Sequence, residues 1–214
     1  MHRYFIKTPW WVQQLFSNYV WRIAATQKVI YLTFDDGPHP TITPWVLDEL
    51  KKYDAKATFF CIGKNVEAHP AIYNRIIAEG HATGNHTYQH LNGWKTGLDA
   101  YLGDVAKASR SIDTNLFRPP YGRITSAQAR NLATMMEKNK VKVIMWDVLS
   151  ADFDKRILPI QCAKNVLKNV SPGSVVVFHD SEKAFENLRI ALPDVLRVLG
   201  GEGYIFEKIV MRNL

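Results

Sequence analysis

Short apolar runs alternate along the chain with longer segments in which apolar side chains recur at helical spacing. Runs such as VIMW and VVVF are apolar at consecutive positions, which is typical of strands buried on both faces of a parallel sheet. The alternation predicts βα units. The predicted strands are 29–34, 57–62, 81–84, 116–118, 141–146, 174–178 and 204–209. The predicted helices between them are 43–53, 65–79, 98–114, 126–139, 159–169 and 182–199.

About seven such units in one domain favour a closed or nearly closed α/β barrel over an open sheet. Residues 1–27 precede the first strand and predict an amphipathic helix, with Thr8 as N-cap and Pro9 as the first helical residue. We expect this helical extension to pack on the barrel formed by residues 28–214. Its apolar stripe consists of Trp11, Val12, Leu15, Phe16, Tyr19, Val20 and Ile23.

Composition excludes several classes of function. The chain has 214 residues, which fits one domain, and a net charge of +7, which suits an anionic environment. Its Lys and Arg residues are scattered, and no nucleic-acid-binding motif is present, so nucleic acid is not an expected partner. The two cysteines are isolated in apolar segments, which favours buried thiols. We see no membrane-spanning run or export signal and therefore expect a cytoplasmic protein. The oligomeric state is left open.

Residues able to bind metal or transfer protons follow five of the predicted strands. In α/β barrels the carboxyl ends of the strands carry the chemistry, so these side chains should converge. They are Asp35 and Asp36 after the first strand, His86 after the third, Arg118 at the end of the fourth, Asp152 shortly after the fifth and His179 after the sixth.

The Asp-Asp pair and the HTYQH segment together have the composition of a catalytic metal site. Neighbouring residues leaving a strand point in different directions, so one carboxylate can bind a cation while the other takes a proton. Two histidines four residues apart on a helical turn share one face and can reach one ion. Asp36, His86 and His90 would supply three ligands and leave a fourth position for water.

The remaining clusters suggest groups that control protons. Arg118, in the stiff RPPYG segment, could hold a carboxylate. A rigid loop with a surface arginine explains that segment equally well. Asp152, when hydrogen-bonded to His179, would raise the pKa of the imidazole and make it a general acid.

These clusters, in this order, resemble the polysaccharide deacetylase family, also called carbohydrate esterase family 4. The matching motifs are TFDDGP, HTYQH, RPPYG, SADF and VFH. The resemblance implies a distorted (β/α) barrel, a metal held by Asp36, His86 and His90, and Zn²⁺ as the expected ion, with Co²⁺ or Ni²⁺ as alternatives. It also implies catalytic roles for five residues. These are Asp35 as base, Arg118 as its tether, His179 as acid, Asp152 as the residue that orients the acid, and Tyr121 as the backbone donor to the oxyanion.

Three positions depart from the family pattern and alter the expected wall around the acetyl methyl group. Leu149 stands where the family has Asp, Phe153 where it has Trp, and Val177 where it has Leu. We expect Val177 and Phe153 to contact substrate. The aromatic residues Trp94 and Tyr88 could stack on sugar rings.

The expected function is metal-dependent removal of N-acetyl groups from amino sugars in a polysaccharide or oligosaccharide. Two alternatives stay open. One is hydrolysis of another carbon–nitrogen bond, as in cyclic amide and imide hydrolases of this fold class. The other is a catalytically silent sugar-binding module. A glycosidase fits poorly, because its two carboxylates must flank the bond about 5–10 Å apart, whereas Asp35 and Asp36 are adjacent.

Overall fold

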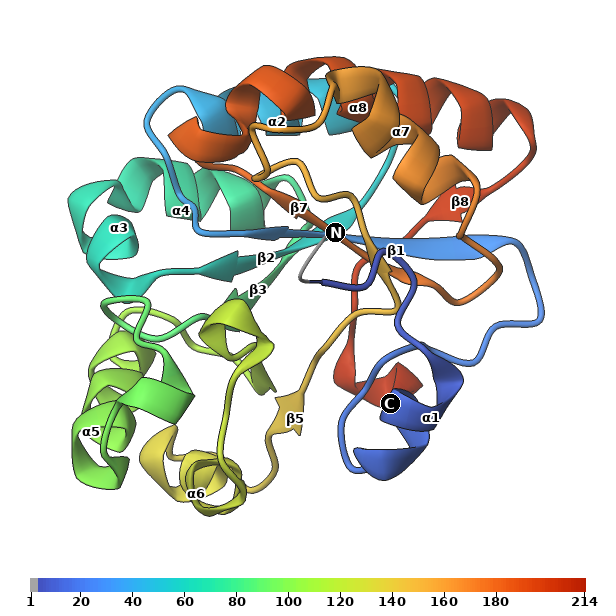
Figure 1. Cartoon of the computed structure of the whole chain (residues 1–214). Helices are drawn as coiled ribbons and strands as arrows, with labels where there is room; N and C mark the ends of the chain where they lie inside the picture. The colour runs from blue at the N-terminus through green and yellow to red at the C-terminus, as the bar shows by residue number, and fades with distance from the viewer. Residues whose placement is uncertain (1–3) are drawn as a thin grey trace.

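Eight strands form one sheet in the computed structural model, which describes residues 4–214 (Figure 1). Residues 1–3 of the predicted N-terminal extension lie outside the described part. The strands are β1 (Val29–Asp35), β2 (Ala57–Cys61), β3 (Ala82–Asn85), β4 (Leu116–Phe117), β5 (Lys142–Val143), β6 (Val148–Leu149), β7 (Val175–His179) and β8 (Ile205–Phe206). The α-helices are α1 (Trp10–Leu15), α2 (Ile42–Lys51), α3 (Gly63–Ala68), α4 (Pro70–Ala78), α5 (Leu98–Ser109), α6 (Ser126–Met135), α7 (Pro159–Leu167) and α8 (Glu182–Gly201).

All the strand pairs are parallel, in the order β5-β4-β3-β2-β1-β7-β6, with β8 added beside β1. Helices α2, α7 and α8 lie on one side of the central strands, and α5 and α6 lie on another (Figure 1). The sheet is therefore the curled, distorted (β/α) barrel that the sequence predicts.

The long central strand β1 is fully enclosed because apolar side chains from both neighbouring strands pack against it. The Phe34 ring stacks on Phe59 of β2 at 5.1 Å and on Phe178 of β7 at 6.0 Å between centroids. Each buried Phe contributes roughly 1.5–3 kcal/mol to folding. The register places Asp35 beside Phe60 on one side and His179 on the other. Polar residues at the ends of the strands are thereby brought to one edge of the barrel.

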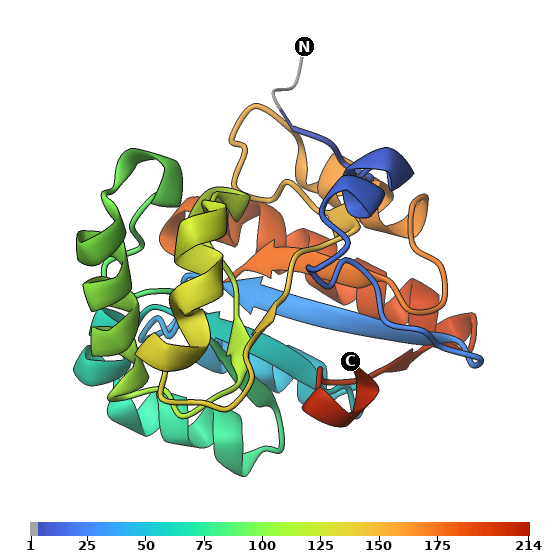
Figure 2. The same cartoon turned by 90° about the horizontal axis from the view of Figure 1, so that it is seen from below.

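The barrel does not close by pairing its two edge strands, β5 and β6. Residues from the N-terminal segment lie along this opening and pair with the chain there (Figure 2). Lys7 pairs antiparallel with Val148, and Val20 pairs parallel with Ile144. The backbone before β1 thus supplies hydrogen bonds that a closing strand would otherwise supply.

The predicted helix over the N-terminal extension is wrong in extent. Helix α1 covers only Trp10–Leu15, and its N-cap is Pro9. The hydroxyl of Thr8 donates to the carbonyl of Trp146 and does not cap the helix. Beyond the helix, Val20 and Arg22 form isolated β-bridges with Ile144 and Ser174, so the backbone there is bridged and not helical. The division into an extension and a barrel stays a prediction.

Two other element predictions need correction. The helix predicted at 65–79 is two helices, α3 and α4, because Pro70 begins the second one. The strand predicted at 141–146 contains only β5, and the short strand β6 was not predicted. Between residues 4 and 214, no helix combines the length and apolarity needed to cross a membrane. Both cysteines are buried and unpaired.

Candidate active site

Asp35, at the end of β1, is held by a fully buried arginine from the loop after β4. Arg118 Nη1 lies 2.7 Å from Asp35 Oδ1 and also donates to the hydroxyl of Thr33 at 2.7 Å. Its other nitrogens donate to the carbonyls of Ile144 and Met145 at 3.0 Å. Because four hydrogen bonds from all three nitrogens fix the guanidinium, the carboxylate of Asp35 is fixed as well. The other oxygen, Oδ2, remains directed at the site.

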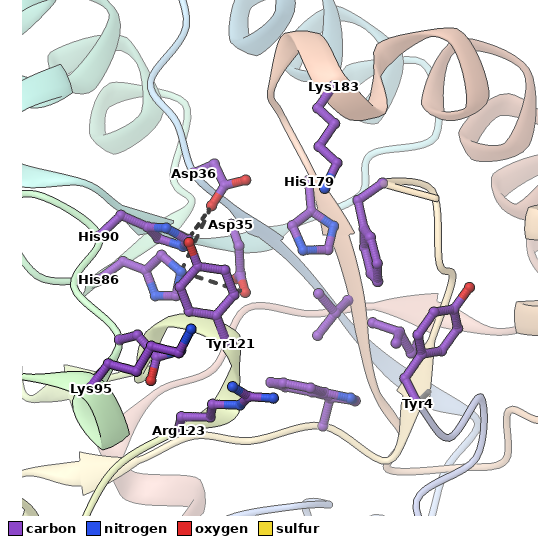
Figure 3. Close-up of a pocket in the computed structure, with 15 residues that line it drawn as sticks. Tyr4, Asp35, Asp36, His86, His90, Lys95, Tyr121, Arg123, His179 and Lys183 are labelled. Carbon is purple, nitrogen blue, oxygen red and sulfur yellow. Dashed lines mark ion pairs between the residues drawn. The ribbon is translucent and has the colours of Figure 1, made fainter. Parts of the chain in front are cut away.

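Asp36, His86 and His90 converge beside this carboxylate. Nε2 of His90 lies 3.3 Å from Asp36 Oδ1, and Nε2 of His86 lies 3.8 Å from the same oxygen (Figure 3). One ligand atom from each residue lies within 4.8 Å of the other two. Asp35 Oδ2 is 4.0 Å from His86 Nε2. The three potential metal ligands and the carboxylate of Asp35 therefore lie next to one another.

The electrostatics of the two histidines suit cation binding. Burial, and after it the neighbouring His90, lower the pKa of His86 to about 3. Burial also lowers the pKa of His90. The neutral ring of His86 donates from Nδ1 to the carbonyl of Arg118 at 2.7 Å, which leaves the Nε2 lone pair facing Asp36. Two imidazole nitrogens and a carboxylate facing one another are complementary to a cation.

The HTYQH segment is not the helical turn that the spacing suggests. It is a bend in which Thr87 and His90 adopt left-handed backbone conformations, with φ of 64° and 60°. Asp104 on α5 holds this bend by accepting the backbone N–H groups of Tyr88 and Gln89 at 2.8 and 3.0 Å. Positive φ at bulky residues is costly and gathers at functional sites. Asp36 itself has a φ of 83°.

On the opposite side of the pocket, His179 ends β7 and pairs with the buried Asp152. Its Nδ1 lies 2.7 Å from Asp152 Oδ1, and its backbone N–H donates to Oδ2 at 2.8 Å. Burial by itself lowers the pKa of His179, but the charge and hydrogen bond of Asp152 outweigh it. The net effect raises the pKa to about 9. The imidazole is therefore protonated at neutral pH, as a general acid requires.

One pocket of about 730 Å³ joins these groups (Figure 3). Val177 and Phe153 line it, as the sequence predicts. Tyr121 also lines it, with a φ of 61° and its ring 4.6 Å from that of His90.

The two aromatic residues expected to stack on sugar do not line this pocket. The hydroxyl of Tyr88 donates to Glu67 on α3 at 2.7 Å, and Lys107 lies 3.7 Å over its ring. The Tyr88 ring therefore packs between α3 and α5. Trp94 is 64% exposed and donates from its indole to the carbonyl of Ile124.

Other pocket residues were missed by sequence reasoning. Trp146 lies close to the SADF motif in the sequence, and this closeness was the available signal. Tyr4 and the pocket's lysine and arginine side chains carried no signal, because they belong to no strand end or motif. The missed lining residues are Tyr4, Asn92, Lys95, Arg123, Trp146 and Lys183, whereas Leu149 lines the pocket at a position already expected to form its wall.

The sequence of this chain is similar to those of known glycan deacetylases. The polysaccharide deacetylase family profile matches residues 22–144. A peptidoglycan-N-acetylglucosamine deacetylase of Bacillus cereus is 32% identical over 200 residues, covering 90% of this chain and 92% of the relative. Another of that name from the same species is 37% identical over 181 residues, 81% of this chain, which spans 63% of that relative's length. A chitooligosaccharide deacetylase of Azorhizobium caulinodans is 32% identical over 166 residues, 74% of this chain and 77% of the relative.

Two solved structures are also similar to this chain. A crystal structure of a peptidoglycan N-acetylglucosamine deacetylase bound to 4-naphthalen-1-yl-N-hydroxybenzamide has a TM-score of 0.81 and 34% identity, covering 94% of this chain and 95% of that chain. A pseudoenzyme of carbohydrate esterase family 4 from Bacillus anthracis has a TM-score of 0.75 and 26% identity, covering 88% of this chain and 66% of that chain. With its motifs gathered at one edge of a curled parallel barrel, the chain belongs to the polysaccharide deacetylase family.

Proposed function

We propose that the chain is a metal-dependent hydrolase that removes N-acetyl groups from amino sugars in a glycan and releases acetate. One observation carries the proposal: Asp36, His86 and His90 share a pocket with a tethered carboxylate and a protonated imidazole. Hydrolysis of an acetamide needs these parts together, because water must be activated and a poor nitrogen leaving group must be protonated.

The three residues fit a divalent cation. Two neutral imidazole nitrogens and a carboxylate form a ligand set preferred by Zn²⁺, and three protein ligands leave a coordination position open. A divalent cation held there supplies Lewis acidity toward water and the acetamide carbonyl. We propose Zn²⁺, with Co²⁺ and Ni²⁺ as ions of similar preference.

Asp35 is the proposed general base. Arg118 fixes one carboxylate oxygen, so Oδ2 is the atom that accepts a proton from the attacking water. The backbone N–H of Tyr121 is the proposed donor to the carbonyl oxygen as negative charge develops on it.

His179 is the proposed general acid. Its Nδ1 is held by Asp152, so the proton on Nε2 passes to the sugar nitrogen as the carbon–nitrogen bond breaks. The products are acetate and a free amine on the sugar. Val177 and Phe153 form the apolar wall that receives the acetyl methyl group.

The experiment is an acetate-release assay on the purified chain, after removal of metal and again after addition of Zn²⁺, Co²⁺ or Ni²⁺. The substrates are a β-1,4-linked N-acetylglucosamine pentamer and purified peptidoglycan strands, since the relatives are named for these two glycan classes. Zn²⁺-dependent release from either glycan supports the proposal. Release that is equal with and without metal would contradict it.

The catalytically silent alternative is motivated by the similar structure from Bacillus anthracis, which is described as a pseudoenzyme of the same family. Glycan binding with no acetate release under any added metal would favour that alternative. Release of product from a cyclic imide such as hydantoin, with none from the glycans, would favour hydrolysis of a different carbon–nitrogen bond.

A further inference from the structure

The segment formed by residues 4–8, at the N-terminal side of α1, is built into the wall of the active-site pocket. Lys7 pairs antiparallel with Val148 of β6. On either side of this pair, the N–H of Leu149 donates to the carbonyl of Ile6, and the N–H of Thr8 donates to the carbonyl of Asp147, both at 2.8 Å. The segment therefore extends the sheet at the strand that carries the apolar pocket wall.

An ion pair with a buried carboxylate anchors this segment. Lys7 Nζ lies 2.7 Å from Asp147 Oδ2 and also donates to the carbonyl of Asn169 at 2.8 Å. The carboxylate of Asp147 is fully buried, and Ser174 donates to the same oxygen at 3.1 Å. Arg22 Nη1 lies 3.4 Å from that oxygen, so Lys7 is one of two cations that neutralise Asp147. The ion pair and the backbone pairing together hold the segment in place.

Successive side chains of an extended segment point to opposite faces. Residues 4 and 6 should therefore share one face, and residues 5 and 7 the other. Tyr4 and Ile6 pack with the apolar cluster of Leu149 and Val177, two residues that line the pocket. Phe5 lies on the other face, where it is 56% exposed and contacts Trp11 at 6.5 Å between rings.

The Tyr4 ring is held in a defined position inside the pocket. Its hydroxyl donates to Asp154 Oδ2 at 2.7 Å, and Arg156 holds the same carboxylate by two further bonds. Its ring meets Phe153 edge to face at 5.4 Å, and Phe153 in turn meets His179 at 5.1 Å. Tyr4 lies across the pocket from the metal cluster (Figure 3).

The pocket extends farther than an acetamido group requires. Its lining runs from His86 and His90 past His179 to Tyr4, so the pocket has room on the Tyr4 side for sugar rings next to the one whose acetamide reaches the metal cluster. A fixed aromatic ring offers apolar area at little entropic cost. The hydroxyl of Tyr4 is bonded to Asp154, so the ring is the part of Tyr4 offered to a sugar.

We propose that Tyr4 is a specificity-determining residue that contacts the sugar rings next to the one being deacetylated. This inference rests on the proposed deacetylase function of the same pocket. It gives the N-terminal segment a role in binding the glycan, and it assigns Asp147 and Lys7 to holding that segment in place.

The test compares wild type, Tyr4→Ala, Tyr4→Phe and Phe5→Ala in the full chain. Phe5→Ala is the matched control, because it removes an aromatic ring one residue away that does not line the pocket. The substrates are the N-acetylglucosamine pentamer, peptidoglycan strands and 4-nitrophenyl acetate, which needs the acetyl site but no neighbouring sugar.

We expect Tyr4→Ala to raise KM about tenfold for the glycan that the wild type accepts, with kcat changed less than about threefold. Tyr4→Phe keeps the ring and should restore KM to within about threefold of wild type. Phe5→Ala should leave KM unchanged and should not alter turnover of 4-nitrophenyl acetate. Tyr4 packs on Phe153, so Tyr4→Ala is judged by comparison: its effect on KM for the glycan should clearly exceed its effect on 4-nitrophenyl acetate. Melting curves of all four proteins identify any loss of folding.

Equal KM values for Tyr4→Ala and Phe5→Ala would overturn the inference while leaving the proposed function standing. A parallel loss of 4-nitrophenyl acetate turnover in Tyr4→Ala would also overturn it, because the residue would then act on the site as a whole. If the wild type released no acetate from either glycan, the proposed function would fail, and this inference would fail with it.

Discussion

Asp35 and His179 lie side by side at the ends of two paired strands, β1 and β7, in parallel register. The backbone N–H of the next residue, Asp180, donates to the carbonyl of Asp35 at 3.1 Å and fixes this relationship. Each side chain has its own buried partner: Arg118 holds Asp35 Oδ1, and Asp152 holds His179 Nδ1 and raises the pKa of that imidazole. Two adjacent strand ends thus bring the proposed base and the proposed acid to the same pocket.

The first prediction concerns this pair. We expect Asp35→Asn and His179→Ala each to lower kcat for acetate release by about 100- to 10,000-fold, because each removes one proton transfer. Acetate release on the glycan substrate is the measurement, with circular dichroism to show that the fold persists. Asp99→Asn on the exposed start of α5 is the matched control for the carboxylate change. Rates near wild type in either active-site variant would reject the assigned roles.

The second prediction concerns the stability of the buried ion pair. Arg118 is fully buried, and Asp35 is only 4% exposed. Replacing Arg118 with Met leaves the carboxylate buried without its partner, so we expect the free energy of unfolding to fall by about 3–5 kcal/mol. Urea titration of the purified variant measures this loss. Arg189→Met is the control, because that side chain pairs with Glu186 at the exposed surface of α8 and should change stability by less than about 1 kcal/mol.

A third prediction follows from the raised pKa of His179. If the protonated ring is the active form, kcat should fall as pH rises through about 9. Asp152→Asn removes the negative charge that raises the pKa of His179 against the effect of burial. The pKa of His179 should then fall, and the alkaline limb of the kcat profile should move to lower pH. The folded state binds this proton more tightly than the unfolded chain does. Its contribution to stability is therefore complete below the ordinary pKa of 6.5 and is lost as pH rises through about 9.

The pH profile of kcat and the midpoint of thermal unfolding, measured from pH 6 to 10, test this prediction together. An alkaline limb at the same pH in wild type and Asp152→Asn would show that another group controls it.

The fourth prediction concerns metal retention. Burial lowers the pKa of both His86 and His90, in the case of His86 to about 3. Protons should therefore compete for these nitrogens only well below the usual pKa of histidine, and we expect one divalent ion per chain to be retained at pH 6. Metal content after dialysis, measured by mass spectrometry, is the readout. His86→Ala and His90→Ala should lose the ion, whereas His39→Ala, outside the cluster, should keep it. Full occupancy in the first two variants would place the metal elsewhere.

The convergence of the site could be predicted from sequence because it depends on strand ends alone. Once TFDD and VVVFH were identified as parallel strands, Asp35, Asp36 and His179 had to emerge at the same edge of the sheet. The polar character of a position after an apolar run is a local signal. No knowledge of loop conformation is needed to use it.

The loops and the N-terminal segment could not be predicted in this way. Tyr88 lies within a motif, but the bend imposed by positive φ at Thr87 turns its ring toward Glu67 and away from the pocket. Tyr4 is held at the pocket by partners far away in the chain: its own hydroxyl bonds to Asp154, and Lys7 pairs with Asp147, 140 residues later. Hydrophobic periodicity reports local structure, and such pairing depends on the completed fold.

The fifth prediction concerns the turn that carries Asp36. Gly37 donates its N–H to Asp180 Oδ1 at 3.0 Å, and a Cβ added to Gly37 would lie 2.1 Å from Asp180 Oδ2. Thr43 donates to the same carboxylate, so Asp180 has no free direction in which to move. Gly37→Ala should therefore displace the turn, lower the free energy of unfolding by about 1–3 kcal/mol and lower metal affinity.

The matched control is Gly201→Ala at the end of α8, where an added Cβ meets nothing within 4 Å. There we expect a gain of up to about 1 kcal/mol, because alanine favours the helix over glycine. Urea unfolding and Zn²⁺ titration of both variants give the comparison. The two substitutions add the same methyl group, so opposite signs would attribute the effect to the contact between Gly37 and Asp180. Equal stability and equal Zn²⁺ affinity in the two variants would mean that this turn tolerates displacement and that Asp180 does not fix the position of Asp36.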